Sequence, residues 1–174
     1  MVRNIFLILL FLSCISAAQQ DTVHQATPLK KVLYLTGASV VFSGIDYLLY
    51  APALRNSTTL MMYRVFQLAL QSAITWFLYD QLGLSAAIGF NLIWWTFGHD
   101  LLYYGFAEIF NPSGGWDGYD SFRDEFMGNK ITWAYWTPIG ISRGMKRNRP
   151  IAGDALIAQA LIGASLAFTI TLTF

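Results

Sequence analysis

The residues of this chain best suited to chemistry are His99 and Asp100, neighbours inside the long apolar stretch 84–110. Asp100, Tyr104 and Glu108 recur at helical spacing and share one face. A histidine beside carboxylates can transfer a proton or bind a metal ion. Because consecutive residues point about 100° apart around a helix, His99 and Asp100 are not expected to bind one ion together. We therefore take His99, Asp100 and Glu108 as candidate catalytic residues and predict no metal site and no cofactor.

The same stretch also contains Asn91, so its polar side chains stand among aromatic and aliphatic ones. Ionisable groups in a membrane-spanning helix are costly and face protein or water rather than lipid. Two interpretations stay open: a site for a proton or ligand, or a set of hydrogen bonds that fixes helix packing. With two histidines in the chain, a histidine-rich di-iron site is excluded.

Hydropathy places this stretch in a membrane protein. The 174 residues are 55% hydrophobic and 12% charged, with a mean hydropathy of +0.45. A soluble domain carries about a quarter charged residues. The net charge of +1 gives no reason to expect a nucleic-acid partner, and a single cysteine, Cys14, allows no intramolecular disulfide.

Four apolar stretches predict an all-α integral membrane protein, an antiparallel bundle of four transmembrane helices. Each stretch has about the 20 apolar residues that a hydrocarbon core requires. Residues 1–18 resemble a signal peptide, with Arg3 before an apolar centre and small residues near Ala18; an uncleaved anchor is the alternative. A polar external tail over 19–31 and one transmembrane domain over 32–174 follow. The predicted spans are 32–52, 58–79, 84–110 and 151–174.

The loop 111–149 is the one sizeable piece expected outside the bilayer. Its segment 131–141 is aromatic but too short to span, so it is expected at the headgroup level or as a re-entrant segment. The basic residues after it are expected to bind anionic lipid headgroups. They are Arg143, Lys146, Arg147 and Arg149.

The distribution of Lys and Arg predicts the orientation. Arg55 lies in loop 53–57 and six basic residues lie in loop 111–149, whereas the second connection and the C-terminus have none. Basic loops are cytoplasmic, so both loops are expected inside a plasma (inner) membrane and both termini outside. An N-terminal export signal leads independently to the same orientation.

This topology gathers the ionisable residues of the spans in the cytoplasmic half of the bilayer. Asp46 and Arg64 come at matched depth in the first two spans, and we expect a direct ion pair between them. The alternative is that Arg64 extends to the headgroups. The predicted polar layer comprises Asp46, Arg64, Gln67, Asn91, His99, Asp100 and Asp154.

Helical spacing also predicts which faces meet. Ser39, Ser43 and Asp46 share a face of the first span, and Arg64, Gln67 and Gln71 share a face of the second. In the fourth span, small residues allow close helix approach. They are Ala160, Gly163, Ala164 and Ala167.

For function, the sequence favours a non-enzymatic accessory or assembly subunit in which the polar layer fixes helix packing or partner contact. One alternative is a membrane enzyme acting on a lipid or lipid-linked substrate at the inner leaflet. The other is a proton-coupled transport component. Expected partners are the lipid bilayer and other membrane proteins or a second copy of the chain. No Walker loop, nucleophile elbow or HExxH motif is present.

Overall fold

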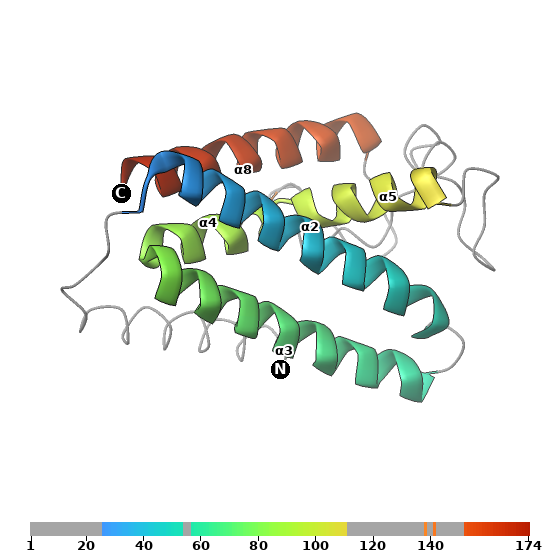
Figure 1. Cartoon of the computed structure of the whole chain (residues 1–174). Helices are drawn as coiled ribbons and strands as arrows, with labels where there is room; N and C mark the ends of the chain where they lie inside the picture. Colours follow the sequence, from blue (N-terminus) through green and yellow to red (C-terminus); the bar gives the residue numbers. More distant parts are fainter. Residues whose placement is uncertain (1–25, 54–56, 111–137, 139–140, 142–151) are drawn as a thin grey trace.

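The computed structural model describes residues 26–53, 57–110, 138, 141 and 152–174. Within these ranges the chain forms five helices and no strand: α2 (Pro28–Ala53), α3 (Ser57–Leu82), α4 (Leu84–Trp95), α5 (Gly98–Phe110) and α8 (Gly153–Thr173). Figure 1 shows α2, α3, the α4–α5 pair and α8 running in alternating directions. The all-α class is confirmed for these residues, whereas the predicted signal peptide over 1–18 and most of loop 111–149 lie outside them.

The first helix begins earlier than expected, inside the predicted polar tail. Proline is favoured in the first turn of a helix because its missing N–H needs no partner there. The Thr27 hydroxyl accepts a hydrogen bond from the backbone N–H of Lys30 (3.3 Å), which satisfies one of the free donors at this end. Residues 28–31 are therefore the start of α2 rather than part of the tail.

The third predicted span is two helices rather than one. The helix ends at Trp95 and restarts at Gly98, and Phe97 between them has a left-handed φ of 78° although it is fully buried. The backbone packs tightly here, since a Cβ at Gly98 would lie 3.0 Å from the Ile93 carbonyl oxygen. The Thr96 carbonyl, freed by the break, accepts a hydrogen bond from Gln159 of α8 (3.3 Å). The prediction of one continuous helix over 84–110 is therefore wrong.

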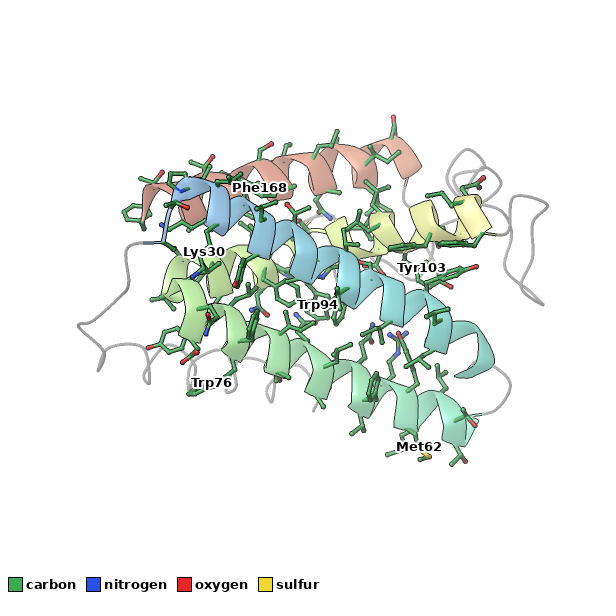
Figure 2. The ribbon with its side chains drawn as sticks, viewed as in Figure 1. Lys30, Met62, Trp76, Trp94, Tyr103 and Phe168 are labelled. Carbon is green, nitrogen blue, oxygen red and sulfur yellow. The ribbon has the colours of Figure 1, made fainter. Side chains whose placement is uncertain are left out.

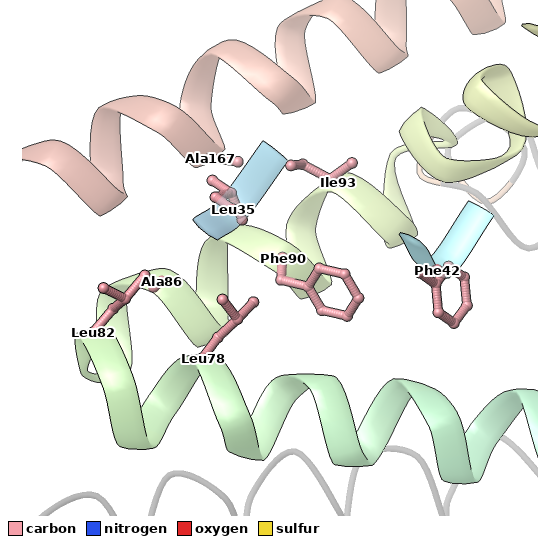
Figure 3. Packing of buried hydrophobic residues seen from close by; sticks show 8 residues of the cluster. All are labelled: Leu35, Phe42, Leu78, Leu82, Ala86, Phe90, Ile93 and Ala167. Atoms are coloured by element: carbon pink, nitrogen blue, oxygen red, sulfur yellow. The ribbon is translucent and has the colours of Figure 1, made fainter. Parts of the chain in front are cut away.

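The helices α4 and α8 pack closely because glycines line their contact. A Cβ at Gly163 would overlap the Thr96 side chain, and one at Gly89 would lie 3.0 Å from the Ala167 carbonyl oxygen. Ala160 and Ala167 are buried in the same contact. The close approach predicted from the small residues of the fourth span is confirmed. Figure 3 shows Ala167 beside the apolar side chains that α2, α3 and α4 contribute to the core.

The outer faces of the helices are apolar. Two helices are long and apolar enough to cross a membrane, over Pro28–Tyr50 and Gly153–Thr173, and α4 is apolar but shorter. Figure 2 shows Met62 and Trp76 of α3 pointing away from the bundle, and they are 68% and 63% exposed. Other exposed apolar side chains on the long helices are Leu33, Val41, Leu48, Val65, Phe66, Phe77, Leu161, Ile162 and Leu166.

The α4–α8 contact yields a test of packing. Gly163→Ala should destabilise the chain by about 1–3 kcal/mol, because the added methyl group forces Thr96 and the helix break to move. Gly37→Ala is the matched control, since a Cβ there would meet nothing within 4 Å. Thermal unfolding in detergent should show a lower Tm for Gly163→Ala alone. Equal effects of the two substitutions would contradict this packing.

Candidate functional site

The first part of the polar layer joins α2 to α3, and we call it the charge cluster. It contains Asp46, Arg64 and Asp100 with the bonding partners Tyr63 and Gln67. The Asp46 carboxylate accepts hydrogen bonds from the Tyr63 hydroxyl and from the Gln67 amide nitrogen (2.9 Å). The Gln67 amide oxygen in turn accepts a hydrogen bond from the Arg64 guanidinium (2.8 Å). Asp46 and Arg64 are therefore connected, but the connection passes through the Gln67 amide and is not the direct ion pair that the sequence suggested.

Aromatic rings hold Arg64 in place. Its guanidinium carbon lies 5.2 Å from the centre of the Tyr50 ring and 5.5 Å from that of Tyr63. A guanidinium at this distance is attracted to the negative face of the ring. Arg64 is otherwise exposed. Its side chain thus combines a hydrogen bond to Gln67 with an exposed surface.

Asp100 completes the cluster from α5. It lies close enough for the charge of Arg64 to favour its carboxylate and for the like charge of Asp46 to oppose it, so α2, α3 and α5 each contribute one charged group. The helix break explains its position, because it makes Asp100 part of the first turn of α5. A carboxylate is favoured in a first turn by the partial positive charge of the free N–H groups.

His99 points elsewhere, and its ring is buried among other side chains. Its Nε2 lies 3.2 Å from the Ser39 hydroxyl oxygen, and its ring centre lies 4.9 Å from that of Phe42 and 4.7 Å from that of Phe90. Only 2% of the residue is exposed. His99 and Asp100 therefore contact different groups, as expected for consecutive helical residues.

The Asn91 side chain forms the third part of the layer, between α3 and α4. Its amide oxygen accepts a hydrogen bond from Gln71 (3.0 Å), and its amide nitrogen donates to the Thr75 hydroxyl and the Ala87 carbonyl (both 2.9 Å). The predicted inward faces of the first two spans thus meet polar partners on other helices. Hydrogen bonds between helices in an apolar surrounding fix their register, because a slipped helix would leave buried polar groups unpaired.

Two acidic residues that the sequence analysis singled out, one as a catalytic candidate and one as a member of the layer, lie apart from it. Glu108 is exposed near the end of α5. Asp154 is exposed in the first turn of α8, where its carboxylate accepts a hydrogen bond from the Ala155 N–H (2.7 Å). The helix α8 supplies Gln159 to the break instead. The basic residues Arg143, Lys146, Arg147 and Arg149 lie outside the described residues.

The sequence-based interpretation missed Tyr63 and Thr75. Both belong to a stripe on α3 that repeats every four residues and includes the two glutamines. The stripe comprises Tyr63, Gln67, Gln71 and Thr75, and each member hydrogen-bonds to α2 or α4. Extending the glutamine spacing by one step in each direction would have found both residues.

The described residues contain no group of three or more histidine, cysteine or acidic side chains placed to hold a metal ion. What the arrangement can do is bond helices to one another and hold two half-buried carboxylates near an exposed guanidinium. The acids of loop 111–149, which an enzyme of this kind would need near His99, lie outside the described residues.

The chain matches no protein-family model, no curated protein and no solved structure. Its function is therefore inferred from the geometry of the polar layer.

Because Gln67 bonds to two charged side chains, we expect it to contribute to the stability of the fold. Gln67→Leu should destabilise the chain by about 1–3 kcal/mol, because Asp46 and Arg64 each lose a hydrogen-bond partner. Gln81→Leu is the control, since the Gln81 side chain bonds only to the adjacent Asp80 near the end of α3. Chemical unfolding in detergent measures both. A Gln67→Leu chain as stable as Gln81→Leu would rule out a structural role for this amide.

Proposed function

We propose that the chain is a polytopic membrane protein in which α2, α3, the α4–α5 pair and α8 each cross the bilayer. In this proposal it serves as a small accessory or assembly subunit, and the polar layer sets how its helices pack and how it meets a partner. The observation that carries the proposal is the distribution of polarity: apolar side chains cover the outside while polar groups hydrogen-bond inside.

The cost of exposing apolar side chains to water favours lipid as the surroundings of the outer faces. Large apolar side chains in water cost about 25 cal/mol for each square ångström exposed, and α2, α3 and α8 each present several. Soluble proteins rarely expose continuous apolar patches of such extent. A bilayer removes this cost, and it also explains why Asp46, Gln71 and Asn91 turn toward other helices.

The orientation is proposed from the sequence. The membrane in this proposal is the plasma (inner) membrane. A cleaved signal peptide over 1–18 would place the mature N-terminus outside the cell, with loops 53–57 and 111–149 in the cytoplasm. The C-terminus would then lie outside with the N-terminus. A reporter fused after Phe174 that is active only in the cytoplasm would contradict this orientation.

A role as a subunit fits the site better than catalysis does. His99 is enclosed by Ser39, Phe42 and Phe90, so a lipid substrate has no approach to its ring in this state of the bundle. Exposed ionisable side chains such as Arg64, Glu108 and Asp154 lie on three different helices. The functional output of such a layer is a defined shape of the bundle.

A proton-coupled transport component is the second candidate, and the helix break favours it. Discontinuous helices in membrane transporters place helix ends and ionisable groups at the substrate site. Here the break at Thr96 and Phe97 directly precedes His99 and Asp100. An enzyme acting on lipids has no comparable feature among the described residues.

The proposed role is tested by native mass spectrometry of the chain extracted from its own membrane in lipid nanodiscs. We expect it to be held in a stoichiometric assembly with another membrane protein or with itself. Gln67→Leu should weaken that assembly and Gln81→Leu should not, because the first alters the packing of α2 and α3. A solitary chain in the native membrane would contradict the subunit role.

A further inference from the structure

Three buried polar atoms of the described chain have no hydrogen-bond partner. They are Ser43 Oγ on α2, Gln71 Oε1 on α3 and His99 Nδ1 on α5. The exposed fractions of these residues are 0%, 4% and 2%. Buried polar atoms in proteins are almost always bonded, either to protein or to ordered water. Three such atoms on three helices require an explanation.

The hydrogen bonds between α2 and α3 place two of the atoms at one level. Asp46 bonds to Gln67, and the two helices run in opposite directions. Ser43 lies about one turn before Asp46, and Gln71 lies about one turn after Gln67. Both steps lead in the same direction along the bundle. Ser43 and Gln71 therefore stand at nearly the same height, one turn from the charge cluster.

His99 lies at this height too. Its ring packs on Phe42, the residue next to Ser43, and its Nε2 bonds to Ser39, one turn earlier on α2. Ser39 occupies one nitrogen of the ring, which leaves Nδ1 on the other side. Along the bundle, Ser43, Gln71 and His99 thus lie within about one helical turn of the same height.

We propose that this level of the bundle is an internal water site, bounded by Ser43, Gln71 and His99. A buried water molecule makes about three hydrogen bonds to polar groups that would otherwise lack partners. The amide oxygen of Gln71 accepts, the Ser43 hydroxyl both donates and accepts, and the free nitrogen of His99 accepts or donates according to its tautomer. One water molecule, or a short chain of them, satisfies all three atoms.

The site continues into the charge cluster and stops at the aromatic side. Asp46 is on the same helical face as Ser43, and Gln67 is on the same stripe as Gln71. Phe42 and Phe90, which pack edge to face with ring centres 5.9 Å apart, close the opposite side of His99. Water at this level therefore lies about one helical turn from the Asp46 carboxylate, on the same face of α2.

The ring nitrogens of His99 report directly on this water. The full-length chain contains two histidines, His24 and His99, so a His24→Gln variant labelled with ¹⁵N-histidine carries one labelled ring. In lipid bilayers, solid-state NMR measures the transfer of magnetisation from water protons to that ring. We expect clear transfer to His99 in this variant.

Two sets of substitutions, one at the proposed water site and one outside it, test the assignment. Ser43→Ala with Gln71→Leu removes two of the three bonding atoms and should abolish the transfer, because the water loses its partners. Ser72→Ala is the control, since Ser72 adjoins Gln71 but is exposed and bonds to Leu68 of its own helix. Transfer that persists in the double variant, or is missing from the parent chain, overturns the proposal.

Ser43→Ala alone provides a second measurement. It removes one hydroxyl and leaves the Gln71–Asn91 bond intact. A hydrated hydroxyl stabilises the bundle, so its removal should lower Tm, whereas removal of a dry, unpaired hydroxyl leaves Tm unchanged or raises it. A Tm that does not fall counts against water at Ser43.

The inference itself rests on the packing of α2, α3 and α5. The proposed location in a bilayer matters only because the NMR sample contains lipid bilayers. The two failures are distinguishable, because co-flotation with lipid vesicles tests bilayer insertion separately. A chain that inserts but keeps His99 dry contradicts the water site alone.

Discussion

The bundle depends on one constraint: polar side chains that its helices turn inward must find partners on other helices, because the outer faces are apolar. Asp46 illustrates it, since its hydrogen bonds to Tyr63 and Gln67 set the register of α2 against α3. Asn91 does the same between α3 and α4 through Gln71 and Thr75. A shift of either helix by one turn would separate these pairs and leave unpaired polar groups in an apolar surrounding.

The break between α4 and α5 follows from the same constraint. It frees backbone groups and holds Phe97 in an unfavourable left-handed conformation, which persists only where neighbours support it. Gln159 of α8 bonds to the Thr96 carbonyl, and Gly163 lets the two helices approach closely enough for that bond. The break in turn directs Asp100 toward Asp46 and Arg64, and His99 toward Ser39. One irregular turn thus separates the two residues that the sequence presents as a pair.

Much of this arrangement follows from helical spacing, and the part that does not has a physical cause. The inward faces of the first two spans, with Ser39, Asp46 and Gln67, were predictable because polar residues that recur every three or four positions must share a side. The break was not, because no proline marks it and the hydropathy of 84–110 is continuous. Gly98 was the one local signal, and it becomes informative only once Ile93 is seen packed against it.

The connection between Asp46 and Arg64 shows what helical spacing alone does not predict. Asp46 and Arg64 are connected as the sequence led us to expect, but their positions along the helices do not reveal which side chain lies between them. Gln67, one turn from Arg64, reaches both charges because its amide has a donor and an acceptor. The prediction that Asp154 joins the polar layer considered its depth alone. In the first turn of a helix, a carboxylate instead bonds to a backbone N–H of its own helix, as Asp154 does with Ala155.

Spin labels on the outer faces measure most directly whether lipid surrounds this bundle. With Cys14 replaced, single cysteines at Val41, Val65 and Leu161, which are 55%, 62% and 59% exposed, would carry the label on α2, α3 and α8. In bilayers, dissolved oxygen should accelerate relaxation at all three positions and a water-soluble nickel chelate should not. A label at Thr27, exposed just before α2, should respond to nickel. Nickel access at Val41, Val65 and Leu161 equal to that at Thr27 would contradict the membrane-embedded bundle.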